Sequence, residues 1–314
     1  MYIENDNTTV ITFQMEGIVM LISQFNIEEL YKEYKDYCLT IAYCLLGSIT
    51  DAEDIVQDTF LKIKEHENKD KKITNMKAYI NKMIVNRCKN ELKSSRKKKE
   101  AYIGTWLPEP LLQEFNGEPV ENLIQSDQLS YSYMVLMENL SPRERIAYVL
   151  RNALGLRHGE IAEILKTSTV NSRKILSRAQ IKIGIKSEKD LTINLQKYFI
   201  DQFILALNKG DIQKLTNLLS NDVLFTADGG GKVRTAINVI KGKKRVLALI
   251  TGISKKFFSG KNANVAIINN QLGIVVTENR KIIGAFCFDW DSPTQSINKI
   301  FYIVNPDKLK RNPV

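Results

Sequence analysis

The sequence has little histidine, and this limits the chemistry open to it. Of 314 residues only His66 and His158 are histidines, and neither lies beyond residue 192. Acid–base catalysis by an Asp/His pair is therefore excluded there, and only a carboxylate base such as Asp228 or Asp289 remains. The sequence has no metal-ligand spacing and no nucleophile motif such as Gly-x-Ser-x-Gly. We predict no enzymatic activity, no metal and no cofactor.

Paired cysteines and long apolar runs are also missing. Cys38, Cys44, Cys88 and Cys287 form no CxxC pair and have no histidine at zinc-site spacing. This usage is typical of small buried residues in a reducing cytoplasm. No apolar run approaches the length of a membrane span, and no signal peptide is evident. We expect a cytoplasmic protein with no membrane partner.

The N-terminal extension, residues 1–24, lacks a helical or strand period through Gln14. We expect it to be disordered or not translated. The codons of Met15-Glu16-Gly17 would be purine-rich, like a ribosome-binding site, a few codons before Met20. We therefore expect translation to start at Met20, which the intact mass of the natively expressed protein would test.

Acidic residues are nearly absent from residues 75–99. This stretch has nine Lys or Arg and the single acid Glu91, so its charge is 9 − 1 = +8, in a chain of formal charge +10. Apolar residues recur at helical spacing from Met76 to Leu92. Most charge runs are solvated faces. A helix with an apolar stripe and a dense face of one sign is better suited to a phosphate backbone.

Two helices are expected before this basic helix. The apolar pattern predicts one from Glu28 to Leu46, ended by Gly47, and one from Asp51 to Lys64. The second has acids in its first turns and lysines in its last, as the helix dipole favours. Its polar side is left free for a partner; it carries Asp54, Gln57, Asp58 and Lys62.

The stretch 101–127 changes character abruptly. It holds three of the seven prolines and five acids, with no Lys or Arg. Proline restricts the residue before it, so an extended acidic linker is predicted. Its segment Trp106-Leu107-Pro108-Glu109-Pro110 is too apolar for a plain tether, and we expect it to dock on something.

The stretch 128–186 predicts a second helical unit. Ser141, Pro142 and Glu144 mark a helix start with a capping box. Residues 160–165, a turn at 166–168 and a helix from 169 to about 183 form a helix-turn-helix pattern. A generic helical hairpin is the alternative, but the cap, the turn and the charges favour DNA binding. The side chains expected to face DNA are Asn171, Ser172, Arg173, Lys174, Ser177 and Arg178.

The stretch 192–314 predicts an α+β domain. Helices at 193–207, 211–219 and 243–257 are followed by strand-like runs at 264–268, 272–277, 281–289 and 297–304. Helices followed by an antiparallel run indicate a curved sheet around a pocket.

The run Asp228-Gly229-Gly230-Gly231-Lys232 invites comparison with a phosphate-binding loop. It fails as a Walker A motif, because Thr226 replaces the first glycine and Val233 the final Ser or Thr. We expect a turn with positive φ or a contact loop.

The parts in this order resemble a bacterial extracytoplasmic-function sigma factor with a SnoaL-like C-terminal extension, from about Phe25 to Lys310. Residues 46–60 resemble the region 2 helix that binds the clamp helices of RNA polymerase. Residues 75–99 resemble the segment that reads and melts the −10 promoter element, and 140–183 resemble region 4, which reads the −35 element. Three segments together resemble the signature motifs of the subgroup that carries the SnoaL-like extension. They are Trp106-Leu107-Pro108-Glu109-Pro110, Asp228-Gly229-Gly230-Gly231-Lys232-Val233 and Asn305-Pro306-Asp307-Lys308-Leu309.

There are departures from the family pattern. Asn90 stands where relatives usually have Asp, Ser172 replaces a usual aliphatic residue, and Thr169-Val170 replaces a Glu-small pair. The departures in the recognition helix, at Ser172 and Thr169-Val170, concern the −35 sequence that is read, not the fold.

The resemblance implies a multidomain protein: two all-α sigma domains, region 2 as a helical bundle (25–100) and region 4 as a helix-turn-helix (128–186), plus a SnoaL-like α+β cone (192–314). It also implies binding to core RNA polymerase and to promoter DNA. The polymerase-binding candidates are Asp51, Asp54, Gln57, Asp58 and Lys62. The −10 candidates are Lys77, Tyr79, Lys82, Asn86, Arg87, Lys89, Asn90 and Lys93.

The C-terminal domain is then expected to regulate in cis, in place of a separate anti-sigma factor. We predict that residues 305–309 and the Asp228 loop lie near the Trp106 linker and hold regions 2 and 4 in a fixed relation. A small-molecule ligand in the cone is left open, since Phe286, Phe288 and Trp290 could equally be core.

Two alternatives remain at this point. The first is a ligand-sensing helix-turn-helix regulator that does not bind polymerase. It would leave the helix from Asp51 to Lys64 and the basic helix at residues 75–99 without a function. A SnoaL-like enzyme on a DNA-binding tether is weakened by the absence of histidine.

Overall fold

The computed structural model describes residues 20–21, 26–65, 72–73, 75–112, 130–184, 193–257, 260–291 and 293–310. The expectations for residues 1–19 and for the later part of the linker, 113–129, lie outside the described residues.

The first helical unit consists of three helices, α1 (Ile27–Leu46), α2 (Ile49–Glu65) and α3 (Met76–Glu100). Asn26 caps α1, and Gly47 ends it with φ of 70°. Two short strands, β1 (Met20–Leu21) and β2 (Lys72–Ile73), pair beside this unit. The helices follow the sequence prediction to within two residues at each end, because apolar period and caps agree locally.

The second helical unit contains α4 (Tyr131–Met137), α5 (Pro142–Asn152), α6 (His158–Leu165) and α7 (Thr169–Ile183). The predicted capping box is present: the Ser141 hydroxyl accepts from the Glu144 N–H, and Glu144 accepts from the Ser141 N–H. Lys166 turns the chain with φ of 50°, and Ser168 caps α7. The helix-turn-helix prediction is confirmed.

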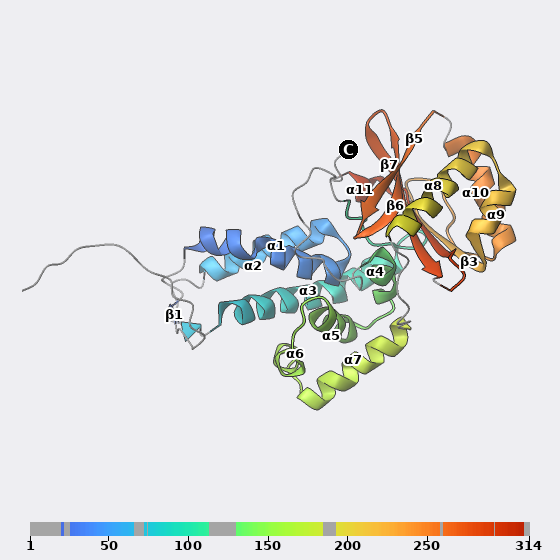
Figure 1. Ribbon diagram of the computed structural model, residues 1–314. Helices are drawn as coiled ribbons and strands as arrows, with labels where there is room; N and C mark the ends of the chain where they lie inside the picture. Colours follow the sequence, from blue (N-terminus) through green and yellow to red (C-terminus); the bar gives the residue numbers. More distant parts are fainter. Residues whose placement is uncertain are drawn as a thin grey trace, which may run out of the picture.

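The two helical units share one hydrophobic core. Ile41 of α1, Ile80 and Ile84 of α3, and Ile146 of α5 are all fully buried in it. Helix α3 packs against α5 and α6, and α1 packs against α5 (Figure 1). The two units are therefore joined by buried apolar surface and not only by the linker.

The C-terminal domain is built on a six-stranded sheet of order β4-β3-β8-β7-β6-β5. Its strands are β3 (Leu219–Asp228), β4 (Ile240–Lys241), β5 (Asn262–Ile268), β6 (Gln271–Glu278), β7 (Lys281–Asp291) and β8 (Ser296–Ile303). Its helices are α8 (Ile193–Lys209), α9 (Ile212–Leu218), α10 (Lys243–Phe257) and α11 (Pro306–Leu309).

Each face of this sheet has its own core. Alternate residues of β7 point to opposite faces: Phe286 and Phe288 pack with α8, α9 and α10, while Ala285 and Cys287 pack with Leu107 of the linker, α4 and α11. The three longer helices lie on one side of the sheet in Figure 1. The other side thus faces the two helical units and the linker.

The α+β prediction holds, with one difference in topology. The sheet is antiparallel except for β3 and β8, which pair in parallel. A parallel pair needs a long crossover, supplied here by β4, α10 and β5 to β7. Within the described ranges, no helix is long and apolar enough to cross a membrane.

Candidate interdomain junction and nucleic-acid interface

The Trp106–Pro110 segment lies in a seam between the helical units and the C-terminal sheet. Leu107 is fully buried, and its N–H donates to Oδ2 of Asp228 at 2.9 Å. The carbonyl of Pro108 accepts from the hydroxyl of Tyr131 on α4 at 2.7 Å. This part of the linker is a fixed structural element and not a tether.

Asp228 is the hub of the junction. Its side chain is buried and accepts from Nζ of Lys308 at 2.7 Å and from the Tyr102 hydroxyl at 2.6 Å, besides the Leu107 N–H. Its backbone carbonyl accepts from the N–H of Asn305 at 3.0 Å. The structure thus places the linker motif, the Asp228 loop and residues 305–309 in one cluster.

Lys308 links this hub to the linker. Its Nζ also donates to the Leu107 carbonyl and lies 4.1 Å from the centre of the Trp106 ring. Nζ of Lys99, at the end of α3, lies 3.3 Å from the same ring. Burial lowers the pKa of Lys308 and lowers that of Lys99 to about 8. Trp106 therefore connects the basic helix to α11.

Two of the glycines in the Asp228 loop are required by this packing. Gly230 has φ of 62°, and a Cβ there would come within 2.4 Å of the Asn305 side chain. Gly231 has φ of 70°, and a Cβ would lie 2.9 Å from Ile103 of the linker. The predicted positive-φ turn is confirmed, and any side chain would also separate the loop from its two partners.

Glu109 fixes the linker to the start of α2. Its carboxylate accepts from the Ser48 hydroxyl at 3.1 Å and from the Ile49 N–H at 2.8 Å. Burial raises the pKa of Glu109. The backbone carbonyl of Glu109 accepts from the Tyr43 hydroxyl at 2.7 Å, and that hydroxyl accepts from Asn269 of the C-terminal domain at 2.7 Å. The linker thus contacts all three folded parts.

Glu138 joins the two helical units directly. It accepts from Nζ of Lys99 at 2.5 Å and from the guanidinium of Arg145, which is 2% exposed. Burial alone would raise the pKa of Glu138, but the charges of Arg145 and Lys99 hold it below its usual value. One carboxylate therefore serves cations from both units.

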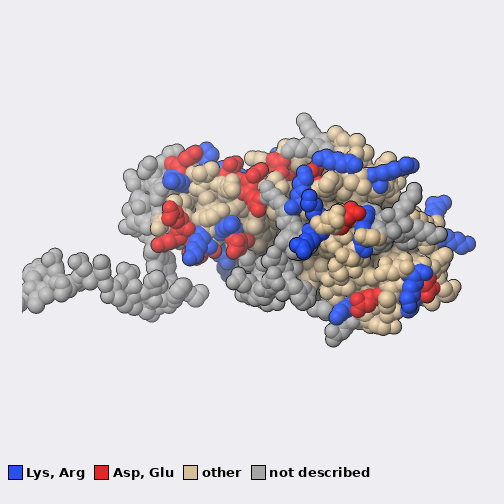
Figure 2. Space-filling view, turned by 90° about the horizontal axis from the view of Figure 1, so that it is seen from above, with Lys and Arg blue, Asp and Glu red and all other residues tan. Residues whose placement is uncertain are grey.

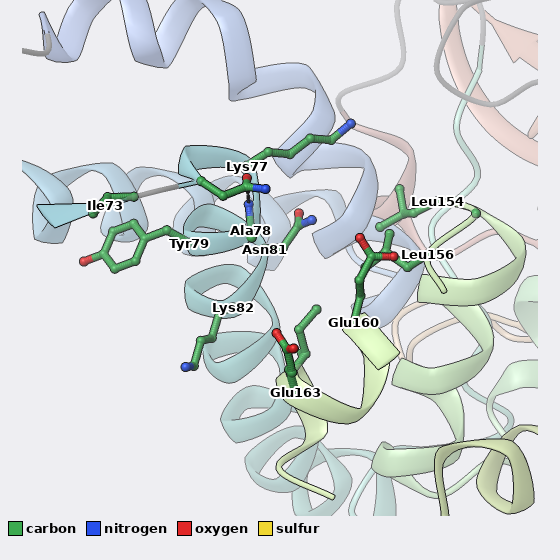
Figure 3. Close-up of a pocket in the computed structure, with 13 residues that line it drawn as sticks. Ile73, Lys77, Ala78, Tyr79, Asn81, Lys82, Leu154, Leu156, Glu160 and Glu163 are labelled. Carbon is green, nitrogen blue, oxygen red and sulfur yellow. Dashed lines mark hydrogen bonds between the residues drawn. The ribbon is translucent and has the colours of Figure 1, made fainter. Parts of the chain in front are cut away.

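The −10 candidates lie along α3, and three of them line a cleft shared with the second unit. Lys77, Tyr79 and Lys82 border a cleft of about 590 Å³, and Glu160 and Glu163 project from α6 on its other side (Figure 3). The remaining candidates point elsewhere: Asn86, Asn90 and Lys93 are exposed, Lys89 is half-buried, and Arg87 pairs with Asp58 at 3.1 Å.

The polymerase-binding candidates form a solvent-facing side of α2. Asp54, Gln57, Asp58 and Lys62 are exposed, and Asp51 is half-buried. The apolar side of α2 is buried against α1 and α3. This polar face is available to a partner in the observed arrangement.

Known proteins match this architecture. Sigma-70 region 2 matches residues 30–98 and Sigma-70 region 4 matches residues 131–183. The ECF RNA polymerase sigma factor SigJ of Mycobacterium tuberculosis is 28% identical over 308 residues, 90% of this chain and 93% of SigJ. The crystal structure of M. tuberculosis SigJ superposes with a TM-score of 0.72 at 25% identity, covering 90% of this chain and 98% of that one.

The chain belongs to the extracytoplasmic-function sigma factors. SigG of the same organism is a more distant relative, 25% identical over 262 residues, 76% of this chain and 69% of SigG. The protein is thus an alternative sigma factor that directs transcription, with a C-terminal extension like that of SigJ. Core RNA polymerase and promoter DNA are the partners that this family implies.

In region 4 of this sigma factor, the face of α7 differs from prediction at one residue. Arg173, Lys174, Ser177 and Arg178 are exposed as expected, and half-buried Asn171 donates to the Thr167 hydroxyl. Ser172, expected to face DNA, is fully buried, so that prediction is wrong. Its position continues the buried stripe of Ile175, Leu176, Ala179 and Ile183, where the 3.6-residue period places it inside.

Replacing Ser172 with alanine is expected to stabilise the sigma factor. In the described structure the Ser172 hydroxyl is buried without a hydrogen-bond partner, and such a group costs about 1–3 kcal/mol. Urea unfolding should show that Ser172→Ala raises the free energy of unfolding more than Ser177→Ala does. Ser177 is exposed, so its replacement changes only the helix propensity. Equal gains, or weaker −35 binding by Ser172→Ala, would contradict the buried assignment.

Acid is expected to loosen α7 from α5. Burial alone would raise the pKa of Glu144, but hydrogen bonds from Lys182 and Ser141 lower it to about 2. A carboxylate with a lowered folded pKa stabilises the fold above its unfolded pKa of about 4.3, and this contribution is lost as the pH falls toward 2. Urea midpoints measured between these pH values should fall less steeply for Glu144→Gln than for the wild type; exposed Glu163→Gln is the control.

Several junction residues were not predicted from the sequence. Each makes a hydrogen bond or ion pair to another part of the chain: Tyr102 to the C-terminal domain, Glu138 to α3, Tyr131 to the linker and Asn269 to α1. Isolated polar residues in helices or loops give no periodic signal. Tyr102 follows the predicted basic helix closely in the sequence, and Glu138 shortly precedes the predicted capping box at Ser141. This proximity is the only signal that could have pointed to them.

Proposed function

We propose that the sigma factor rests in a closed state and that its C-terminal domain regulates it by contact. In that state regions 2 and 4 are held against each other, and binding to polymerase and promoter requires them to separate. The observation that carries this proposal is the single hydrophobic core that α1 and α3 share with α5 and α6.

The spacing of promoter elements supports the proposal. The −10 and −35 elements are centred about 25 base pairs apart, which is about 85 Å at about 3.4 Å per base pair. Helix α3, the −10 reader, packs directly against α6, the first helix of the helix-turn-helix. Two elements in contact cannot read sites at that separation on duplex DNA.

Electrostatics in the cleft support it as well. Glu160 and Glu163 lie on the wall opposite Lys77, Tyr79 and Lys82. Carboxylates that line the same cleft as these −10 candidates repel the phosphates of a melted strand. By contrast, the exposed cations of α7 remain accessible. The closed state therefore masks the part of the −10 surface formed by Lys77, Tyr79 and Lys82 and leaves the −35 surface open.

In the open state we assign three surfaces. Tyr79, Asn86, Lys89 and Asn90 contact bases of the −10 element, and the Lys and Arg positions of α3 neutralise phosphates. Arg173, Lys174, Ser177 and Arg178 enter the major groove at −35. The polar face of α2, with Asp51, Asp54, Gln57, Asp58 and Lys62, binds polymerase. The cytoplasm is the compartment in which these partners meet.

Regulation by contact, without catalysis, is supported by the carboxylates of the C-terminal domain. Asp228 is engaged by Lys308, Tyr102 and Leu107, and Asp289 pairs with Lys299 at 2.9 Å. Neither is held ready as a base. Phe286 and Phe288 are buried in the core. A small-molecule ligand in this domain stays a prediction.

Energy transfer between two labels tests the proposal. Dyes would be placed at Lys64→Cys on α2 and Arg157→Cys before α6; both sites are exposed, and the four native cysteines are buried. We expect high transfer in the free protein and a large loss on forming a complex with core polymerase and promoter DNA. Labels at Lys35→Cys and Lys64→Cys, both in region 2, should report no change. Unchanged transfer in a complex that initiates transcription would overturn the proposal.

A further inference from the structure

The C-terminal domain contains a long stretch without a single acid. Residues 229–277 include no Asp or Glu and nine Lys or Arg, namely Lys232, Arg234, Lys241, Lys243, Lys244, Arg245, Lys255, Lys256 and Lys261. Seen from above, most of the charged side chains visible on this domain are Lys and Arg, with fewer Asp and Glu among them, whereas the helical part shows both signs in similar measure (Figure 2). Soluble surfaces usually mix the two signs, so a segregated charge of this size calls for an anionic partner.

The densest part is a basic strip at the junction of β4 and α10, formed by Lys241, Lys243, Lys244 and Arg245. Three of the four are exposed and Lys243 is half-buried. Within the part of the chain that the structure describes, none of the four has an acidic partner. Lys232 differs, because it pairs with Asp307. The strip therefore offers uncompensated charge to solvent.

Stability of the fold does not account for the strip. Lys243, Lys244 and Arg245 occupy the first turn of α10, which contains no acid. The N-terminal end of a helix carries partial positive charge, so cations there are unfavourable. The like charges also repel one another. Their placement works against α10 and is better explained by an external anion.

We propose that the basic strip binds the phosphate backbone of duplex DNA beside the −35 element. The inference rests on the proposed role of α7 as the −35 reader. Helix α7 ends at Ile183 and α8 begins at Ile193. Whatever path the intervening residues take, nine residues span at most about 32 Å at about 3.6 Å each. Once α7 lies in the major groove, the C-terminal domain cannot leave the neighbourhood of the DNA, even after regions 2 and 4 separate.

A charge-reversal pair tests this inference in the assembled holoenzyme. The strip variant is Lys241→Glu/Lys244→Glu/Arg245→Glu. The control is Lys197→Glu/Lys209→Glu/Lys214→Glu, three exposed lysines on α8 and α9 that change the net charge of the same domain by the same amount. The measurements are promoter affinity over a range of salt concentrations and, separately, affinity of each variant for core polymerase without DNA.

We expect the strip variant to bind promoter more weakly and with a weaker salt dependence. The slope of log affinity against log salt should fall by up to about 2.7, that is about 0.9 for each of three phosphate contacts. The control should keep the wild-type slope, and both should bind core polymerase normally. Equal slopes for wild type and strip variant, or an equal fall in the control, would overturn the inference. So would weakened binding of the strip variant to core polymerase alone, since the partner would then be an acidic polymerase surface. Failure of every version to initiate would count against the sigma-factor mechanism itself, a distinct result.

Discussion

Replacing Asp228 with alanine is expected to lower the free energy of unfolding by about 3–5 kcal/mol, because it leaves a buried lysine without its counter-charge. Lys308 is 8% exposed, and its Nζ lies 2.7 Å from the Asp228 carboxylate. The Leu107 N–H and the Tyr102 hydroxyl lose their acceptor in the same step. Urea unfolding followed by tryptophan fluorescence measures the loss, since Trp106 lies in this cluster.

Two variants control this prediction. Asp222→Ala removes an exposed carboxylate from the same strand and should change stability by no more than about 0.5 kcal/mol. Asp228→Ala combined with Lys308→Met removes the stranded charge and should recover much of the loss. A single Asp228→Ala variant as stable as the wild type would show that the buried ion pair does not hold the junction.

Replacing Glu138 with alanine is expected to have a comparable effect on the contact between regions 2 and 4. Arg145 would be left buried without a counter-ion and Lys99 without its partner, at a cost of about 3–5 kcal/mol. The cost falls on the closed state, because Lys99 belongs to α3 of region 2 and the guanidinium of Arg145 is buried where it donates to the Cys44 carbonyl of α1. Energy transfer between labels at positions 64 and 157 should fall in the free protein, without polymerase or DNA.

The matched control is Glu163→Ala, an exposed carboxylate on α6. It should leave the label separation of the free protein unchanged. Transfer that stays high in Glu138→Ala would mean that apolar burial alone keeps the two regions together. The same carboxylate gives a pH test: the lowered folded pKa of Glu138 makes its contribution present above about pH 4.3, the unfolded value, and lost as the pH falls through the lower folded pKa.

Local patterns made the helices of this protein predictable. The capping box at Ser141 and the apolar period of α7 fixed those helices almost to the residue, because caps and periodicity act over a few residues. Strand β3 was missed, since its parallel partner β8 follows some seventy residues later and leaves no turn signal. The error at Ser172 has a similar origin: residue type suggested solvent, but the helical period placed it in the core.

The junction could be predicted only in part. Three short motifs resembling a family signature pointed to residues 106–110, 228–231 and 305–309, and the structure places them together. The ion pair of Asp228 with Lys308 and the bridge from Glu138 to Lys99 could not be derived, because these residues lie 80 and 39 positions apart and their contacts depend on the tertiary fold. The shared core of regions 2 and 4 was likewise not foreseen, since each helix would be amphipathic in either arrangement.

In the closed state that we propose, the shared core sets how the sigma factor competes for polymerase. If only one molecule in about a hundred is open, its apparent affinity for core polymerase is about a hundredfold below the intrinsic value. At equal abundance, such a protein binds a smaller share of core polymerase than rival sigma factors do. Its share, and transcription from its promoters, increases only when its own level or its open fraction rises. Regulation then requires no removal of an inhibitor: a shift of about 2.7 kcal/mol in the closed–open balance raises the open fraction from about 1% to about 50%, and promoter occupancy at low abundance rises about fiftyfold. The buried leucines and isoleucines between α3 and α5 would thus determine how much free energy is needed to activate the protein.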